Sequence, residues 1–302
     1  MRTFQAQGSA TTAAAEPFLK EERASRLWRA WKLVQANPLG VFGAALILLL
    51  IIAGVFAPAI ARYPINQFAG TPNQAPNATH LFGTDKLGQD IFSRVVYGAR
   101  ISLKVGFFSV GLASAIGMAI GIFSGYLGGI VDTVIQRIVD TAIAFPQLIL
   151  LLIVIRLLGP SIVNVILVIA IGVIPGVARI VRGAVLSESR NTYIEAARAT
   201  GASNLRIMLR HLAPNVLPLA IVIATTLLGA AILAEAALSF LGLGIPPPNP
   251  SWGADVAASR TSYPLNVWAA LFPGLAISLT VLGFNLLGDS LRDILDPRLR
   301  GR

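Results

Sequence analysis

The chain has 302 residues, of which 55% are hydrophobic and 13% charged, and its mean hydropathy of +0.72 is too high for an ordinary soluble domain. The absence of cysteine excludes disulfides, thiolate metal sites and cysteine nucleophiles. The net charge of +10 is compatible with nucleic-acid binding, but in a membrane protein the distribution of basic residues across the bilayer must be considered first.

Six apolar runs have about the length of helix, roughly 20 residues, that crosses ~30 Å of hydrocarbon. The predicted spans are residues 39–60, 103–127, 142–158, 162–180, 217–241 and 267–287. The segment before them, residues 1–38, contains acidic residues and does not have the pattern of a signal peptide. We therefore predict an all-α polytopic membrane protein with six transmembrane helices.

The basic residues predict how these spans are oriented. Most of the 24 Lys and Arg residues lie before the first span, between the fourth and fifth spans, and after the last span. Because short cytoplasmic segments are enriched in Lys and Arg, both termini and a segment at 181–215 are predicted to be cytoplasmic. The charge is then a topology signal rather than a nucleic-acid-binding patch. The remaining predicted parts are an extracellular loop at 61–102, a core of spans at 103–290, an extracellular loop at 242–266 within it, and a cytoplasmic tail at 291–302.

Two of the predicted spans have small residues at every fourth position, a pattern that lets a second helix approach closely. These residues are Gly117, Gly121 and Gly125 in the second span and Gly172 and Gly176 in the fourth. Pro146 and Pro175 are expected to kink the third and fourth spans.

Residues 191–215 form a polar, basic interruption between the fourth and fifth spans. Thr192 and Glu195 match a capping box, in which Thr192 would be the N-cap of a short helix. Gly201 stands where such a helix would end in the left-handed conformation. The segment could be a docking surface for a partner, and its alanines would permit a close approach.

A second short helix is predicted over residues 205–211, with Ser203 as its N-cap and Pro214 at the start of the fifth span. The three arginines of this region, Arg198, Arg206 and Arg210, allow another interpretation. They could hold the segment at lipid headgroups as an interfacial amphipathic linker. Physical reasoning from the residues leaves both interpretations open.

The segment resembles the EAA signature of ABC-transporter permease subunits. That signature is E-A-A, three residues, G, nine residues and I-x-L-P, and the matching residues here are Glu195, Ala196, Ala197, Gly201 and Pro214. His211 stands at the Ile position and Ala213 at the Leu position. Four other stretches are similar to permeases of dipeptide, oligopeptide and nickel importers: "ANPLGVFG" (36–43), "LFGTDKLGQDIFSRVVYGARISL" (81–103, with Gln89 where Arg is usual), "ALSFLGLGIPPPNPSWG" (237–253) and "DILDPRLRG" (293–301).

The resemblance implies the second permease subunit of such an importer, with a type I, MetI-like permease fold, in the inner membrane of a prokaryote. It implies import of peptides, with nickel or another small solute as the alternative. It also implies that residues 192–200 are a coupling helix, in which the ATPase-coupling residues are Thr192, Glu195, Ala196, Ala197, Arg198 and Gly201. The implied partners are a homologous second permease, two ATPase subunits, an extracellular solute-binding protein and membrane lipid, but no nucleic acid.

The sequence contains no G-x-x-x-x-G-K-[ST], H-E-x-x-H or G-x-S-x-G pattern. Its two histidines, His80 and His211, are predicted on opposite sides of the membrane, so they cannot share a metal ion. We therefore predict no catalytic residues, metal site or cofactor in this chain. ATP and Mg would be bound by the partner ATPase subunits.

Acidic residues in or near the spans need partners or water. A lipid-facing charge at Glu235 would cost about 2.5–3.5 kcal/mol, so its side chain should face the helix bundle or a wet cavity. Two roles are possible for this residue: it could line a translocation pathway, or it could form a structural hydrogen bond to a neighbouring helix. Asn285 in the sixth span is the second candidate for the pathway. Asp140 is expected to belong to a solvated stripe with Asp132 and to pair with Arg137.

Two other functional classes are compatible with parts of the sequence. A secondary transporter would need ion-coupling residues within its spans, and its uptake would be insensitive to ATP depletion. A membrane scaffold would bind partners through residues 191–215 and would move no solute.

Overall fold

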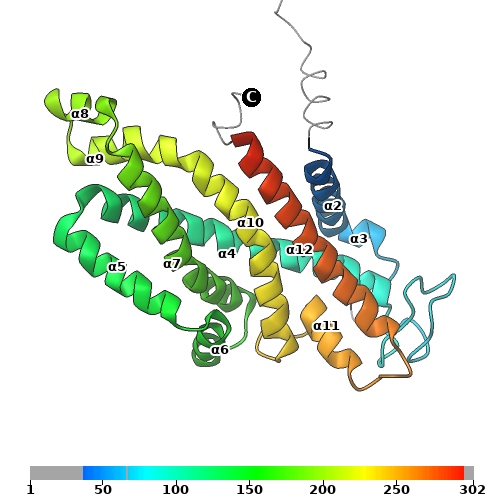
Figure 1. The fold of residues 1–302 in the computed structure, drawn as a ribbon. Coiled ribbons are helices and arrows are strands. Elements are labelled where there is room, and N and C mark those ends of the chain that lie inside the picture. The colour runs from blue at the N-terminus through cyan, green and yellow to red at the C-terminus, as the bar shows by residue number, and fades with distance from the viewer. Residues whose placement is uncertain (1–36, 66, 296–302) are drawn as a thin grey trace, which may run out of the picture.

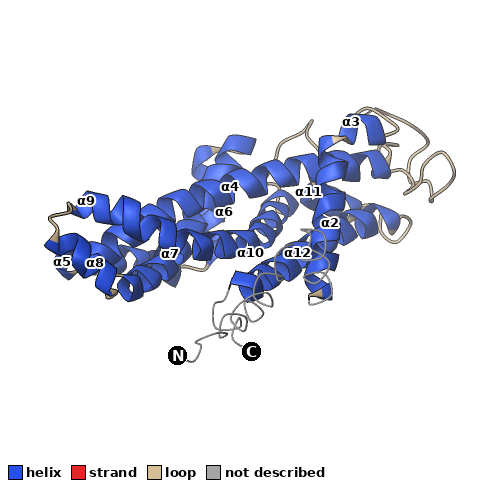
Figure 2. Ribbon diagram, turned by 90° about the horizontal axis from the view of Figure 1, so that it is seen from above, coloured by secondary structure: helices blue, strands red, loops and turns tan. Residues whose placement is uncertain are grey.

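The computed structural model describes residues 37–65 and 67–295, and within these residues the regular secondary structure is entirely helical (Figures 1 and 2). The predicted N-terminal segment 1–38 and the tail 291–302 therefore lie largely outside the described residues. The helices are α2 (Pro38–Val55), α3 (Ala57–Ile60), α4 (Ile91–Leu127), α5 (Gly129–Ala144), α6 (Gln147–Leu158), α7 (Ile162–Glu188), α8 (Thr192–Ala199), α9 (Asn204–Ile207), the π-helical η1 (Met208–Leu212), α10 (Ala213–Phe240), α11 (Trp252–Ser259) and α12 (Trp268–Leu295).

Five helical segments of the described chain are long and apolar enough to cross a membrane, and a bent pair of helices supplies a sixth candidate. The five are α2, α4, α7, the continuous run from α9 to α10, and α12. The sixth, α5 with α6, differs from the straight span predicted at 142–158, because its two halves are bent by 93°. Phe145 lies at the bend with extended backbone angles (φ −78°, ψ 134°), as expected for a residue that precedes a proline.

The second span begins before its apolar run does. Asp90 caps α4 by accepting a hydrogen bond from the Ser93 amide at 2.8 Å, and the helix then continues for 37 residues. Residues 91–102, which lie within the extracellular loop predicted at 61–102, are thus part of the same helix as the second span. The first span, in contrast, is shorter than its apolar run. A break at Phe56 divides the predicted range 39–60 into α2 and α3, and Pro58 lies in the first turn of α3.

The glycine face predicted in the second span packs against α7. A Cβ atom at Gly117 would lie 2.8 Å from Val177, one at Gly121 would lie 2.7 Å from the Ala178 carbonyl, and one at Gly125 would lie 3.0 Å from Val185. The two backbones can approach closely because these side chains are absent. In α7, Gly172 faces Leu151 of α6, whereas Gly176 has no described atom within 4 Å of its Cβ position. The predicted close packing is therefore confirmed for the three glycines of α4 and for Gly172, but not for Gly176.

Ion pairs join α5 to α7. Arg182 binds Asp132 with two donors, of which Nε lies 2.6 Å from Oδ1, and Arg179 pairs with Asp140. The predicted pairing of Asp140 with Arg137 is wrong, because the packing of α7 beside α5 supplies arginines from another helix.

The tight α4–α7 contact predicts that Gly121→Ala destabilises the fold. The added methyl group would meet the Ala178 carbonyl and Val181, and overpacking of this kind costs about 1–3 kcal/mol. Gly111→Ala is the matched control on the same helix, since no described atom lies within 4 Å of its Cβ position. Denaturant titration of the purified chain in detergent measures both free energies of unfolding, and equal losses would contradict the packing described.

Candidate functional site

Helix α8 lies at one end of the molecule, close to the turn between α4 and α5 and far from α11 (Figures 1 and 2). It begins differently from the prediction. The N-cap is Asn191, whose backbone is extended (φ −73°, ψ 142°), and Thr192 is already helical. The predicted capping box is therefore wrong, because the chain turns one residue earlier, where the Asn191 carbonyl accepts a bond from the Ile194 amide at 3.0 Å.

The end of α8 is as predicted. Gly201 has φ +80°, a conformation that glycine adopts without strain. The amide of Ala202 bonds to the carbonyl of Ala197, and the amide of Gly201 bonds to the carbonyl of Arg198, each at 3.0 Å. This double arrangement is the Schellman motif, which satisfies carbonyls that a helix end would otherwise leave unpaired.

One apolar side chain anchors α8 to the core. Ile194 is fully buried and belongs to the same hydrophobic cluster as Ile207 and Leu212, with Ala197 packed at its edge. On the opposite side, Thr192, Glu195, Ala196 and Ala199 are exposed. The helix therefore presents small and polar side chains outward while its underside is fixed.

The Tyr193 hydroxyl ties α8 to two neighbouring helices. It donates a hydrogen bond to Glu188 at the end of α7 and accepts one from Asn215 in α10 at 2.9 Å. Partial burial, and secondly the neighbouring Glu188, raise the pKa of Tyr193 above its ordinary value. The hydroxyl therefore remains protonated at physiological pH and can act as the donor to Glu188.

A third tie reaches the end of α4. Tyr126 donates a hydrogen bond of 3.1 Å to Asn204, and the Arg198 guanidinium lies over the Tyr126 ring, 5.2 Å from its centre. Together with Tyr193, this contact connects α8 and the turn that follows it to the ends of α4, α7 and α10. Direct polar contacts therefore connect the α8 region to three long helices.

The polypeptide after α8 is one long helix rather than two. Ser203 caps it, accepting from the Arg206 amide at 3.4 Å as predicted, and the helix then runs without a break from Asn204 to Phe240. Pro214 lies in the first turn of α10, as predicted, but no break precedes it, because the wider π turn η1 lies just before it and the Ala213 amide bonds to the Met208 carbonyl. This arrangement accommodates a residue that has no amide hydrogen.

An open groove lies between α8 and this long helix. Its lining residues are Tyr193, Ala196, Ala197, Thr200, Ala202, Arg206, Arg210 and His211. Of the predicted coupling residues, only Ala196 and Ala197 line the groove. Thr192 and Glu195 are on the exposed surface, Arg198 contacts Tyr126, and Gly201 shapes the turn. The alanines and the two arginines give the groove an apolar floor with cationic edges.

Sequence reasoning missed the residues that hold α8 in place: Tyr193, Glu188, Asn215, Tyr126 and Asn204. The only available signal was the position of Tyr193 inside the EAA-like stretch. The other four come from helix ends that only the tertiary fold brings together.

The two candidate pathway residues lie on neighbouring helices but do not meet. Glu235 is fully buried in α10, where Ser239 and Ser251 each donate to its carboxylate at 2.8 Å. A weaker contact of 3.4 Å comes from Ser102 of α4. Asn285 of α12 is exposed and lies opposite Gly229, six residues or roughly 9 Å along α10 from Glu235. The hydrogen bonds fit the structural alternative for Glu235, and pathway lining by either residue stays a prediction.

The segment that binds Glu235, at the start of α11, packs between α4 and α10. Beside Ser251, the buried Trp252 donates from Nε1 to the Val95 carbonyl of α4 at 2.9 Å. A Cβ atom at Gly253 would lie 1.9 Å from the Ala236 carbonyl of α10, so only glycine fits there. The start of α11 is thus fixed against both α4 and α10.

Comparisons with known proteins extend over almost the whole chain. Residues 117–301 match the family of binding-protein-dependent transport system inner membrane components, and residues 25–76 match the N-terminal transmembrane domain of oligopeptide transport permease C. The dipeptide transport system permease protein DppC of Alkalihalophilus pseudofirmus is 44% identical over 90% of each chain. The glutathione transport system permease protein GsiD of Escherichia coli is 42% identical over 95% of this chain and 96% of its own.

The solved structures show a similar fold. The inward-facing MetNI methionine ABC transporter contains a chain that matches with a TM-score of 0.55 at 23% identity. The match covers 67% of the present chain and 97% of that chain. A second crystal form matches with a TM-score of 0.56 at 22% identity, covering 68% and 98%. The MetI-like fold predicted from the sequence is confirmed, and about a third of the chain lies outside the match.

Tyr193→Phe should loosen α8 while leaving the spans folded, since it removes two hydrogen bonds worth about 0.5–1.5 kcal/mol each. We expect hydrogen exchange of the amides of residues 193–200 to become about tenfold faster. Tyr97→Phe is the control, because within the described chain the Tyr97 hydroxyl has no hydrogen-bond partner. Unchanged exchange in the Tyr193 variant would show that these bonds do not hold the helix.

Proposed function

The chain belongs to the family of binding-protein-dependent transport system inner membrane components, and from this membership we propose that it is the permease subunit of an ATP-driven importer of peptides. The two relatives described above support the substrate class, since one is named for dipeptides and the other for glutathione, itself a tripeptide. The alternative cargo is nickel or another small solute, since the sequence also resembles permeases of nickel importers.

In this proposal α8 is the coupling helix. The observation that carries it is the connection of α8 to the ends of α4, α7 and α10 through Tyr193, Tyr126 and Asn215. An ATPase subunit seated against the exposed side of α8 and the neighbouring groove would move the three helices together. Ala196 and Ala197 allow the close approach, while Arg206 and Arg210 favour an acidic partner surface beside it.

Two partner ATPase subunits on the cytoplasmic side, which is the side of α8, bind ATP with Mg and hydrolyse the ATP. Closure of these subunits draws the coupling helices together and turns the spans outward, and hydrolysis resets them. Shifting a two-state equilibrium from 1:99 to 99:1 requires about 5.5 kcal/mol of differential binding. A helix that carries this load has to be held firmly, which is what the buried Ile194 and the polar ties provide.

A homologous second permease completes the translocation pathway, and an extracellular solute-binding protein delivers the cargo. Glu235 and Asn285 remain the candidates for the pathway half that this chain contributes. Glu235 would act there by fixing the start of α11 against α10 and α4.

Cross-linking tests where the ATPase binds. Because the chain has no cysteine, an Ala196→Cys variant carries one thiol, which a benzophenone maleimide can label. In the assembled complex we expect this label to cross-link to an ATPase subunit. The label on Ala258→Cys should not, since Ala258 is an exposed alanine of α11 at the opposite end of the molecule. Cross-linking of the Ala196→Cys label to other subunits but not to an ATPase subunit would contradict the proposal.

Gly201→Val tests whether α8 couples hydrolysis to transport. A β-branched residue at φ +80° is strained by about 1–2 kcal/mol, which displaces the end of α8. We expect the reconstituted complex to hydrolyse ATP without moving peptide. Gly242→Val is the matched control, because Gly242 ends α10 with φ +78° and, like Gly201, has no described atom within 4 Å of its Cβ position. If both variants uncouple ATP hydrolysis from transport equally, the effect comes from backbone strain alone and does not support a coupling role for α8.

A further inference from the structure

Helices α2 and α12 pack closely along one half of their length and separate along the other. A Cβ atom at Gly40 would meet the Ser290 side chain, and one at Gly283 would lie 3.1 Å from the Leu46 Cβ atom. Beyond Leu46, a groove of about 440 Å³ opens between the two helices. It lies in the half of α2 and α12 that adjoins α3 and α11, here called the outer half (Figure 1).

The groove is apolar and opens sideways. Its floor is formed by the buried side chains of Val96 and Ala99 of α4 and Trp252 of α11. Its two edges are exposed, since Leu49 of α2 is 68% exposed and Leu279 of α12 is 43% exposed. The opening therefore lies between two membrane spans, where their surface meets hydrocarbon.

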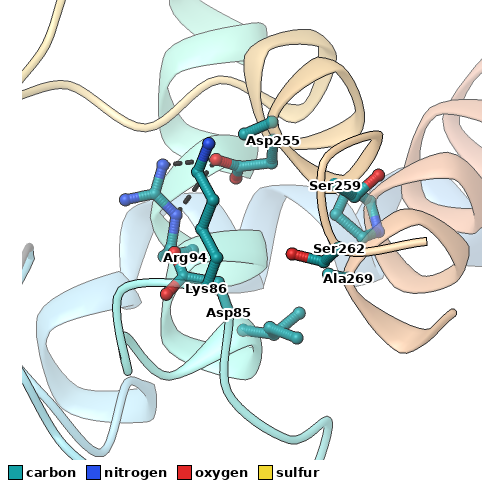
Figure 3. A pocket seen from close by; sticks show the side chains of 10 residues that line it. Asp85, Lys86, Arg94, Asp255, Ser259, Ser262 and Ala269 are labelled. Atoms are coloured by element: carbon teal, nitrogen blue, oxygen red, sulfur yellow. Dashed lines mark hydrogen bonds and ion pairs between the residues drawn. The ribbon is translucent and has the colours of Figure 1, made fainter. Parts of the chain in front are cut away.

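The groove is closed toward the loops beyond α4 and α11. Phe82 stacks on Phe272 of α12, with ring centres 3.8 Å apart. Figure 3 shows that Arg94 of α4 is bonded to Asp255 of α11, with Lys86 beside this pair. The polar cleft at the pair has a volume of about 20 Å³, enough for about one water molecule. An apolar ligand therefore enters the groove from the membrane rather than through this cleft.

The dimensions of the groove distinguish between apolar occupants. It extends about 12 Å along α12, from Phe272 to Thr280, and about 20 Å along α2 and α3, from Leu46 to Ile60. A volume of 440 Å³ over these lengths gives a mean cross-section of about 20–40 Å². A helix with its side chains is about 10–12 Å wide, or roughly 80–110 Å² in cross-section. The groove is thus too narrow for a partner's helix and wide enough for a single hydrocarbon chain.

The outer end of the groove indicates which chain it holds. One leaflet of hydrocarbon is about 15 Å thick, which matches the length of the groove. Arg62 follows the lining residue Ile60 by two positions and is exposed. Its Nη1 donates to the Ala78 carbonyl at 2.8 Å, and it forms no ion pair with another described residue. Because a guanidinium binds phosphate strongly, this end suits the headgroup of a phospholipid.

We propose that this groove binds one acyl chain of a phospholipid from the leaflet on the α11 side, with the phosphate held by Arg62. The inference uses only the membrane location of the chain, so it is independent of the transported solute. The acyl chain packs against Trp252, whose Nε1 donates to the Val95 carbonyl at 2.9 Å. The adjoining Ser251 binds Glu235 of α10. The lipid therefore supports the contact of α11 with both α4 and α10.

Labelling of the whole purified complex in detergent tests the site, because no bilayer then surrounds the spans. The probe is phosphatidylglycerol with a diazirine in its acyl chain, and we expect saturable labelling of residues 46–60 and 272–280. Ala276→Phe and Ala53→Phe fill the groove from α12 and α2. Each should lower the labelling about tenfold, as expected if about two methylene groups lose their place. Ala119→Phe is the control, since Ala119 is exposed on α4 outside the groove.

Arg62→Gln tests the phosphate contact without altering the packing of the spans. We expect this variant to weaken labelling by the phosphatidylglycerol probe and to leave labelling by a diacylglycerol with the same diazirine chain unchanged. An equal effect of Arg62→Gln on both probes, or no effect on either, would overturn the assignment of the phosphate to Arg62.

Three further outcomes would overturn the site itself. The first is labelling that does not saturate and is as strong at the exposed Phe107 and Leu157 as in the groove, which would show ordinary solvation of apolar surface. The second is a loss of labelling in Ala119→Phe equal to that in the groove variants, or no loss in the groove variants. The third is cross-linking of a thiol at Leu275→Cys, on the groove edge, to a second permease, which would show that protein covers the groove.

Discussion

The close contact between α4 and α7 is the constraint on which the rest of the described structure depends. Gly117, Gly121 and Gly125 let the α4 backbone lie directly against Val177, Ala178 and Val185 of α7. Helix α4 has 37 residues, so it extends for roughly 55 Å. Its start carries Asp90, together with Arg94, which bonds to Asp255 of α11, and its end carries Tyr126 beside α8. A single packed helix therefore joins the surroundings of α11 to those of α8.

The two ends of α4 are built in the same way. Each adjoins a short helix fixed by one large buried side chain, Ile194 for α8 and Trp252 for α11. A glycine with positive φ adjoins each helix, Gly201 after α8 and Gly242 between α10 and α11, and polar side chains supply the remaining ties. Such an element moves as a unit with the spans to which it is fixed. This property suits a surface that must pass a displacement from a bound partner into the membrane.

The regular features of this fold could be predicted from the sequence because they depend on local patterns. The six apolar runs, the helix end at Gly201 and the glycine face of α4 each follow from spacing along the chain. The errors arise where packing between distant residues decides the outcome. The Thr192 capping box was a permitted local pattern, yet the turn at the end of α7 made Asn191 the cap. The partners of Asp132 and Asp140 are 50 and 39 residues away, beyond any helical spacing rule.

The remaining spans show how motion at α8 would spread. Helix α2 packs on α12, where a Cβ atom at Gly43 would lie 2.8 Å from the Gly283 carbonyl. The polar contacts described above tie the α8 region to α4, α7 and α10. In the proposed coupling, a displacement of α8 would reach α12 through α10, across the contacts of Gly229 with Phe284 and of Thr226 with Gly288. Asn285 lies at this junction, so the environment of its amide changes whenever α10 shifts against α12.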